Sequence, residues 1–311
     1  MKSFSLAKAI QFYLEQRRCL GFPLKEDGQM LQQLVKYAAQ IHHRGPLTTQ
    51  LALAWAQAPT QSSRLWWARR LDASRRFATF WRAFDPRTEV PPTGILGPSY
   101  RRRAVHLYTR QQIADLMEAA SNLGGIRGLT FHTVIGLLAC TGLRIGEALR
   151  LTDQDIDWTE SCLMVRHSKL RRSRSVPLQD SCLSALRVYR KRRLKYHPRS
   201  DHSAFFLGRN GRRVSYGQAA FTFQRLRQQL SWNQDPVPRL HDLRHTFAVG
   251  CLIDWYSSNQ NVAQNVLSLA TYLGHSSIHD TYWYLSAVPQ LLALTHARWP
   301  DLALAQGGAH V

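Results

Sequence analysis

Arginine, histidine and tyrosine recur in three short motifs in the second half of the chain. Each motif alone has an ordinary structural explanation, as a helix start, a helical turn or an aromatic helix. Together they supply two guanidiniums, several imidazoles and a phenol, a set that can hold an anionic ester and attack it with an oxygen nucleophile. The motifs are TGLRIGE with Arg144 and Glu147, HDLRHTF with His241 and Arg244, and LGHSSIHDTYWYL with His275 and Tyr284.

The chemistry that suits these residue types is attack on a phosphodiester. Two arginines can hold the non-bridging oxygens with paired hydrogen bonds, because a guanidinium stays ionised and presents a planar fork. Tyrosine has an ordinary pKa of about 10 and needs nearby cations or a histidine to lose its proton at neutral pH. Lys169, in the basic stretch SKLRRSR, is a candidate to protonate the departing oxygen.

The order and spacing of these motifs resemble the tyrosine recombinase family, also called the phage integrase family. TGLR-x-x-E is followed by a lysine in a stretch that closes in V-P-L, then by H-x-x-R-H and L-G-H, and Tyr284 comes nine residues after His275. The resemblance covers residues 107–284, with a connector at 251–272 that is longer than usual. The segment DTYWYLSAVPQL also resembles a subgroup carried by mobile elements whose recombinases are encoded in adjacent sets.

The resemblance implies a reaction and a role for each matched residue. Attack would give a 3′-phosphotyrosyl bond and a free 5′-hydroxyl, followed by strand exchange and religation without ATP, metal or any other cofactor. His245 is expected to be structural. The implied roles are Arg144 and Arg244 as the phosphate clamp, Glu147 as support for the site, Lys169 as the proton donor, His241 as the proton acceptor, His275 as a hydrogen-bonding partner of the phosphate and Tyr284 as the nucleophile.

Two other functions stay open at this point. A type IB topoisomerase uses similar tyrosine chemistry, although the hairpin, the L-G-H motif and the modest length favour a recombinase. A DNA-binding accessory protein of a mobile element could keep the fold without cleaving DNA. The complete set of seven matched positions is evidence against the accessory protein.

The charge balance predicts a polyanionic partner. The chain has 41 Lys and Arg against 20 Asp and Glu, a formal net charge of +21, and neutralising phosphates releases counterions. We expect double-stranded DNA, although charge alone would also suit a basic protein that binds RNA or a membrane. For each single arginine a solvated surface position is the alternative. The candidate DNA contacts are Arg69, Arg70, Arg75, Arg101, Arg102, Arg103, Arg171, Arg172 and Arg174.

The motifs lie in the second of two expected domains, and the expected fold class is mainly α with a small β-sheet. Residues 1–88 show apolar residues at helical spacing and resemble a helical core-binding domain. Residues 89–106 are rich in proline and arginine and are predicted to be a basic linker. Residues 107–311 would be the catalytic domain with a C-terminal tail helix. Its first helix is predicted to start with a capping box formed by Thr109 and Gln112, and its strands lie around CLMVRH and SVPL.

Assembly and location follow from the same reasoning. Recombination needs two cut sites held together, so we expect a homo-oligomer on DNA, a tetrameric synapse, and sister recombinases as further partners. The five cysteines form no C-x-x-C pair, which argues against a disulfide framework or a zinc site. No signal peptide and no apolar run of transmembrane length are found, so we expect no membrane partner and a cytoplasmic, nucleoid-associated protein.

The residues after Tyr284 predict a tail helix with an apolar stripe. Such a stripe must be buried, either on its own catalytic domain or on a neighbouring protomer. The resemblance implies exchange of the tail between protomers. The stripe consists of Val288, Leu291, Leu292, Thr295 and Trp299.

Overall fold

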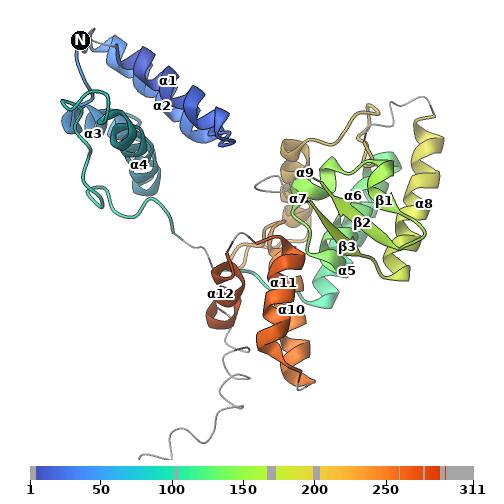
Figure 1. The fold of residues 1–311 in the computed structure, drawn as a ribbon. Helices are drawn as coiled ribbons and strands as arrows, with labels where there is room; N and C mark the ends of the chain where they lie inside the picture. Colours follow the sequence, from blue (N-terminus) through green and yellow to red (C-terminus); the bar gives the residue numbers. More distant parts are fainter. Residues whose placement is uncertain are drawn as a thin grey trace, which may run out of the picture. The chain divides into compact units, whose positions relative to one another are not determined.

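The structure, a computed structural model, describes residues 5–101, 104–166, 173–198, 204–258, 260–275, 277–287 and Leu291. The chain divides into two compact units, residues 1–103 and 104–311 (Figure 1). Each unit has its own hydrophobic core. The described residues form helices and one small sheet, so the predicted fold class is confirmed. Among them no helix is both long and apolar enough to cross a membrane.

The first unit is built from helices whose starts are fixed by short polar side chains. The hydroxyls of Ser5, Thr48 and Ser63 each accept a hydrogen bond from a backbone N–H in the first turn of the helix that follows. Such a cap satisfies a donor that would otherwise lack a partner. The helices of the described part are α1 (Leu6–Cys19), α2 (Lys25–Gln40), α3 (Thr49–Gln57) and α4 (Arg64–Trp81).

The aromatic residues of the first unit form its core. Trp55 and Phe77 are fully buried, and Phe77 stacks on Trp81 with ring centroids 6.3 Å apart. The segment predicted as a basic linker, residues 89–106, contacts this unit, because Val90 and Leu96 pack against the same core. Prolines prevent regular structure here, but they do not prevent apolar side chains from being buried.

The second unit contains further helices and a three-stranded antiparallel sheet in the order β1–β2–β3. The predicted capping box is confirmed, because the Thr109 side chain accepts from the Gln112 backbone and the Gln112 side chain accepts from the Thr109 backbone. The elements are α5 (Arg110–Ser121), α6 (Gly125–Thr141), α7 (Ile145–Arg150), the 3-10 helix η1 (Asp153–Asp155), β1 (Ile156–Asp157), β2 (Cys162–Val165), β3 (Arg174–Pro177), α8 (Asp180–Tyr196), α9 (Tyr216–Gln229), α10 (Asp242–Ser257), α11 (Val262–Leu273) and α12 (His279–Ala287).

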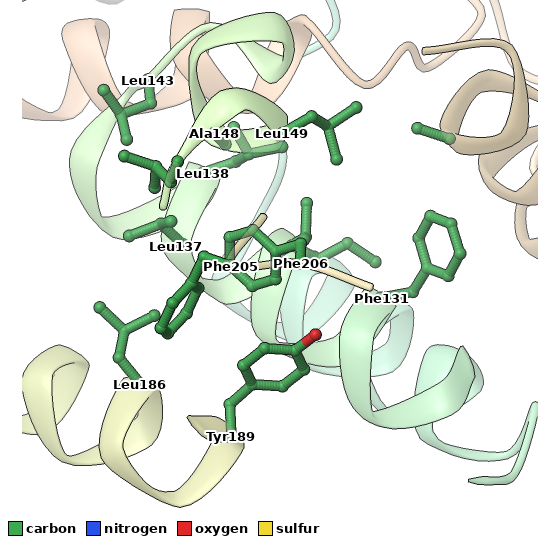
Figure 2. Close-up of a cluster of buried hydrophobic side chains, with 14 of the residues drawn as sticks. Phe131, Leu137, Leu138, Leu143, Ala148, Leu149, Leu186, Tyr189, Phe205 and Phe206 are labelled. Atoms are coloured by element: carbon green, nitrogen blue, oxygen red, sulfur yellow. The ribbon is translucent and has the colours of Figure 1, made fainter. Parts of the chain in front are cut away.

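Helix α6 is the central element of the second unit. Apolar residues surround it on most sides, as expected for a helix packed against α5, α8 and α10. Figure 2 shows Leu137 and Leu138 of α6 beside Leu186 and Tyr189 of α8 and the adjacent rings of Phe205 and Phe206. This packing fixes the C-terminal end of α6, from which the chain continues into TGLR.

Helices α10, α11 and α12 share a separate apolar cluster. Tyr284 of α12 and Leu291 are both buried in it, against Leu252 and Val266 among others. Of the predicted tail stripe, Leu291 therefore packs on its own chain. The other stripe residues, Val288, Leu292, Thr295 and Trp299, lie outside the described residues.

Candidate active site

A left-handed glycine places the first arginine. Gly142 ends α6 with a φ of 60°, and an added Cβ would lie 2.5 Å from Cδ1 of Phe247. Only glycine fits both the backbone conformation and the space. Two residues later Arg144 is the N-cap of α7, and its guanidinium donates to the backbone carbonyls of Leu273 (3.4 Å) and Gly274 (2.9 Å). The turn between α6 and α7 therefore directs Arg144 toward the L-G-H motif.

Glu147 connects two arginines beneath this turn. Its carboxylate accepts from the Arg144 backbone (3.0 Å) and guanidinium (2.9 Å), and from both terminal nitrogens of Arg174 (3.1 and 2.9 Å). The Glu147 side chain is 2% exposed. Burial alone would raise the pKa of Glu147, but the hydrogen bonds and charges of Arg174 and Arg144 lower it to about 2. Glu147 therefore stays ionised and orients both guanidiniums.

Arg244 lies in the first turn of α10 and is almost completely buried, at 2% exposure. It donates to the carbonyls of Gly142 (2.8 Å) and Leu273 (2.7 Å). Burial and the nearby Arg144 lower the pKa of Arg244 to about 10, so it remains charged at neutral pH. Because Arg144 and Arg244 both donate to the Leu273 carbonyl, the two guanidiniums lie next to each other.

Histidines line the same site. His241, at the N-cap of α10, and His245, one turn later, have ring centroids 4.7 Å apart. His275 places Nδ1 2.7 Å from the hydroxyl of Thr281. Burial and the neighbouring positive charge, mainly that of Arg244, lower the pKa of His241 and of His275 to about 4. Burial and the neighbouring His241 lower the pKa of His245 to about 3. All three imidazoles are therefore neutral at pH 7.

Tyr284 lies within this group, on α12. Its side chain is 2% exposed, its hydroxyl lies 2.8 Å from Nδ1 of His245, and its ring lies 6.3 Å from that of His275. Burial raises the pKa of Tyr284 to about 12, although the charges of Arg244 and Arg144 oppose this rise. The phenol is therefore protonated in this state and close to two neutral imidazoles.

Neighbouring tyrosines are arranged differently. Tyr282 is 45% exposed, two residues from Tyr284 on the same helix. Tyr272 stacks on Phe247 with ring centroids 5.6 Å apart, and burial raises its pKa. Among the tyrosines near the L-G-H motif, Tyr284 is the one bonded to a histidine of H-x-x-R-H in the described part of the chain.

Two of the predicted DNA contacts are corrected by the structure. Arg70 is 7% exposed, donates to the Trp55 carbonyl (2.8 Å) and stacks over the Trp55 ring at 4.2 Å, so it is a core residue of the first unit. Arg174 binds Glu147 and the carbonyl of Tyr272 (2.6 Å), so it supports Arg144 instead of facing solvent.

The other predicted contacts are exposed, paired or outside the described residues. Arg69 is half-exposed and pairs with Glu26, Arg75 pairs with Asp72, and Arg101 is exposed. Outside the described residues lie Lys169, Arg102, Arg103, Arg171 and Arg172.

The sequence reasoning did not anticipate the contact between His245 and Tyr284. The available signal was spacing, since residues 241 and 245 lie four apart on a helix and share a face. In the described ranges, no three His, Cys, Asp or Glu side chains come together in a way that could hold a metal ion.

Comparison with known proteins extends these observations. The family model of the phage integrase family matches residues 107–290. The chain is 36% identical over 310 residues to y4rB of Sinorhizobium fredii, which is described as an integrase/recombinase, with 94% of this chain and 98% of that protein covered. It is 27% identical over 228 residues to the tyrosine recombinase XerC of Chlamydia caviae, with 73% and 69% covered.

The fold is similar to that of a solved integrase. The Tn1549 transposon integrase in complex with transposon right end DNA matches with a TM-score of 0.69 and 17% identity, over 96% of this chain and all of that one. At this identity the likeness shows the fold. The family is shown by the family model, which matches more than half of the chain, and by a relative that is 36% identical across nearly its full length. The chain therefore belongs to the phage integrase family and is a tyrosine recombinase, an enzyme of site-specific DNA recombination.

Proposed function

We propose that Tyr284 cleaves one DNA strand at a time by attacking a phosphodiester, with Arg144 and Arg244 as the clamp on the scissile phosphate. One observation carries this proposal: in the described ranges Arg244 is a buried cation whose hydrogen bonds go to neutral carbonyls. A buried charge without a carboxylate partner is costly, and an incoming anion would relieve that cost. Glu147 does not supply this partner to Arg244, because its carboxylate already pairs with Arg144 and Arg174.

The guanidiniums retain donors for the phosphate. Arg244 donates two hydrogen bonds to protein carbonyls, and a guanidinium has five N–H donors. Arg144 lies beside it and shares the Leu273 carbonyl. Donors fixed in this way would stabilise the charge that develops on the non-bridging oxygens.

Proton transfer would use the neutral imidazoles. In the attack, the Tyr284 oxygen forms a bond to phosphorus, the bond from phosphorus to the 5′ oxygen breaks, and the phenol proton passes to a histidine nitrogen. His245 holds the hydroxyl in this structure, and we propose that it positions Tyr284 while His241 accepts the proton. Lys169 would give a proton to the 5′ oxygen. Reversal with a different 5′-hydroxyl would complete strand exchange.

The arrangement corresponds to a resting state. Tyr284 is 2% exposed and bonded to His245, so a phosphate cannot reach its hydroxyl unless α12 moves or the cluster around it opens. We propose that DNA binding shifts α12 and releases the phenol toward the two arginines. As the hydroxyl approaches these guanidiniums, their charge would lower its pKa toward neutrality.

The partners are proposed from solved structures of similar fold, and the location is proposed from the expected DNA substrate. The solved relatives include XerH bound to palindromic difH and a lambda integrase dimer bound to a core site. We propose that this chain likewise binds double-stranded DNA as a homo-oligomer, with a tetrameric synapse and sister recombinases, in the cytoplasm at the nucleoid. Residues 1–88 and residues 107–311 would each contact the duplex. Exposed arginines such as Arg69 and Arg101 remain candidate backbone contacts.

The test is recovery of covalent complexes from a library of randomised DNA duplexes, in EDTA and without ATP. Complexes that survive denaturation in detergent are isolated through the protein, and their DNA is sequenced. A recombinase predicts one shared sequence joined through its 3′ phosphate. Covalent complexes without a shared sequence would support a topoisomerase, and the absence of covalent complexes would support a non-cleaving accessory protein.

A further inference from the structure

Two cysteines far apart in the sequence lie in contact near the active site. The sulfur of Cys140, in the last turn of α6, is 3.3 Å from the sulfur of Cys182, in the first turn of α8. Cys140 is exposed and Cys182 is partly exposed. Both helices are held by the core of the second unit, which keeps the two thiols together.

The surroundings of Cys182 favour its thiolate form. Cys182 is the third residue of α8, a helix of 17 residues whose N-cap, Gln179, provides no side-chain hydrogen bond. Free N–H groups and the positive end of the helix dipole stabilise an anion at such a position. The hydrogen bond from Cys140 acts in the same direction and lowers the pKa of Cys182, while donating that bond raises the pKa of Cys140.

We propose that Cys140 and Cys182 form a reversible disulfide that acts as a redox switch on the active site. A disulfide needs a sulfur–sulfur distance of about 2.05 Å, so closure from 3.3 Å requires a movement of about 1.3 Å. Rotation of the two side chains with a small shift of the helix ends can supply it. In a reducing compartment, disulfides of this kind are transient and responsive to oxidants.

The chemistry balances with a low-molecular-weight disulfide as the oxidant. The Cys182 thiolate attacks one sulfur of a glutathione-type disulfide and releases one thiolate, which leaves a mixed disulfide on Cys182. The Cys140 thiol then loses its proton and attacks the Cys182 sulfur, and the second small thiol departs. In total the two protein thiols lose two electrons and two protons, and the small disulfide becomes two thiols.

The cross-link would act on the clamp through a short path. Gly142 lies two residues after Cys140, and its carbonyl accepts a hydrogen bond from Arg244. Arg144, the other arginine of the clamp, lies two residues further along the chain. Gly142 is closely packed against Phe247, so this turn cannot absorb a displacement of the α6 end freely. Because a misplacement of about 1 Å can reduce an enzyme's rate by about 100-fold, oxidation is expected to slow cleavage.

Peptide mapping of the full chain, without DNA, tests the disulfide. The protein is treated with oxidised glutathione, the remaining thiols are alkylated, and trypsin digestion follows without reduction. We expect peptides 128–144 and 175–187 to appear as one species, about 2 Da lighter than their sum and separable by dithiothreitol. Cys19→Ser is the matched control and should keep the link, whereas Cys182→Ser should lose it. Alkylation of both cysteines, or a link from either to Cys251, would overturn the pairing.

The rate of covalent complex formation tests the switch, and this part rests on the proposed cleavage activity. Oxidised wild-type protein should cleave at least about 10-fold more slowly than reduced protein, with recovery in dithiothreitol. Cys140→Ser should cleave at the same rate in both conditions. Equal rates for oxidised and reduced wild type would show a stabilising cross-link and overturn the switch. No cleavage by the reduced protein would instead refute the proposed function and leave the peptide result standing.

Discussion

At the scale of single residues, the two arginines of the clamp differ in what compensates their charge. Arg144 has Glu147 as a partner, whereas Arg244 is held by the carbonyls of Gly142 and Leu273. Both surroundings fix the guanidinium plane, and that plane is the property a lysine cannot reproduce. The planar fork of each arginine should therefore matter to cleavage more than its charge.

Arg144→Lys and Arg244→Lys test this directly. Each variant should keep DNA binding and lose cleavage by about 10²–10³-fold, the usual cost of removing one preorganised donor. Initial rates of covalent complex formation and a filter-binding assay measure the two properties separately. Arg212→Lys, at an exposed position, is the matched control and should behave as wild type. Near-normal cleavage by either clamp variant would show that its arginine only anchors the phosphate.

The histidines of the site, of which His245 and His275 are half-buried and His241 is exposed, predict that acid destabilises the protein. The pKa values of His241 and His275 are lowered to about 4 and that of His245 to about 3, below the ordinary value of about 6.5. The unfolded chain therefore binds more protons than the folded one, and stability is lost as the pH falls from about 6.5 toward 4. His245 and His275, which are half-buried, each contribute at most about 1.4 kcal/mol per pH unit in that window, and the exposed His241 contributes less because solvent screens its charge.

Urea unfolding at pH 7 and pH 5 measures this effect. The free energy of unfolding should be lower at pH 5, and the difference should shrink in His245→Gln. His279→Gln, at an exposed histidine of α12, is the control and should keep the full difference. A stability independent of pH between 7 and 5 would mean that the three imidazoles are solvated in the folded protein.

At the scale of elements, the turn from α6 into α7 positions the clamp. Gly142→Ala should destabilise the protein by more than about 1 kcal/mol and also slow cleavage, because Cβ would lie 2.5 Å from Phe247 and the carbonyl bound by Arg244 would shift. The control is Gly146→Ala in α7, where Cβ has an ordinary contact at 3.5 Å and helix propensity favours alanine. Thermal unfolding separates the two, and equal stabilities would contradict this role of the turn.

The sequence predicted the helices and strands more accurately than the surroundings of individual arginine side chains. The capping box at Thr109 and the strands around residues 162–177 follow from local patterns, which the structure confirms. The positions of Arg70 and Arg174 depend on distant partners, Trp55 and Glu147, which no local pattern contains. For Arg70 a partial signal existed, since residues 70, 74, 77 and 81 lie on the face of α4 that is buried.

At the scale of the whole molecule, the surface on which the C-terminal tail packs can be tested. Leu291 is fully buried on its own chain, so Leu291→Ala should lower the stability of the DNA-free monomer by about 2–5 kcal/mol. A chain truncated after Leu291 keeps this contact and should fold normally and bind a single site. If residues 292–311 dock on a neighbouring protomer, the truncated chain should assemble on paired sites less cooperatively. Unchanged assembly in gel-shift titrations would place the tail on its own domain.

The measurement that tests the central claim most directly is peptide mapping of the covalent adduct on a nicked duplex in EDTA. A nick just 3′ of the scissile phosphate lets the short fragment that carries the free 5′-hydroxyl diffuse away and traps the intermediate. The predicted result is a nucleotide attached through its 3′ phosphate to Tyr284, and no adduct in Tyr284→Phe. An adduct on the exposed Tyr282 or on Tyr272, or cleavage by Tyr284→Phe, would contradict the assignment of the nucleophile.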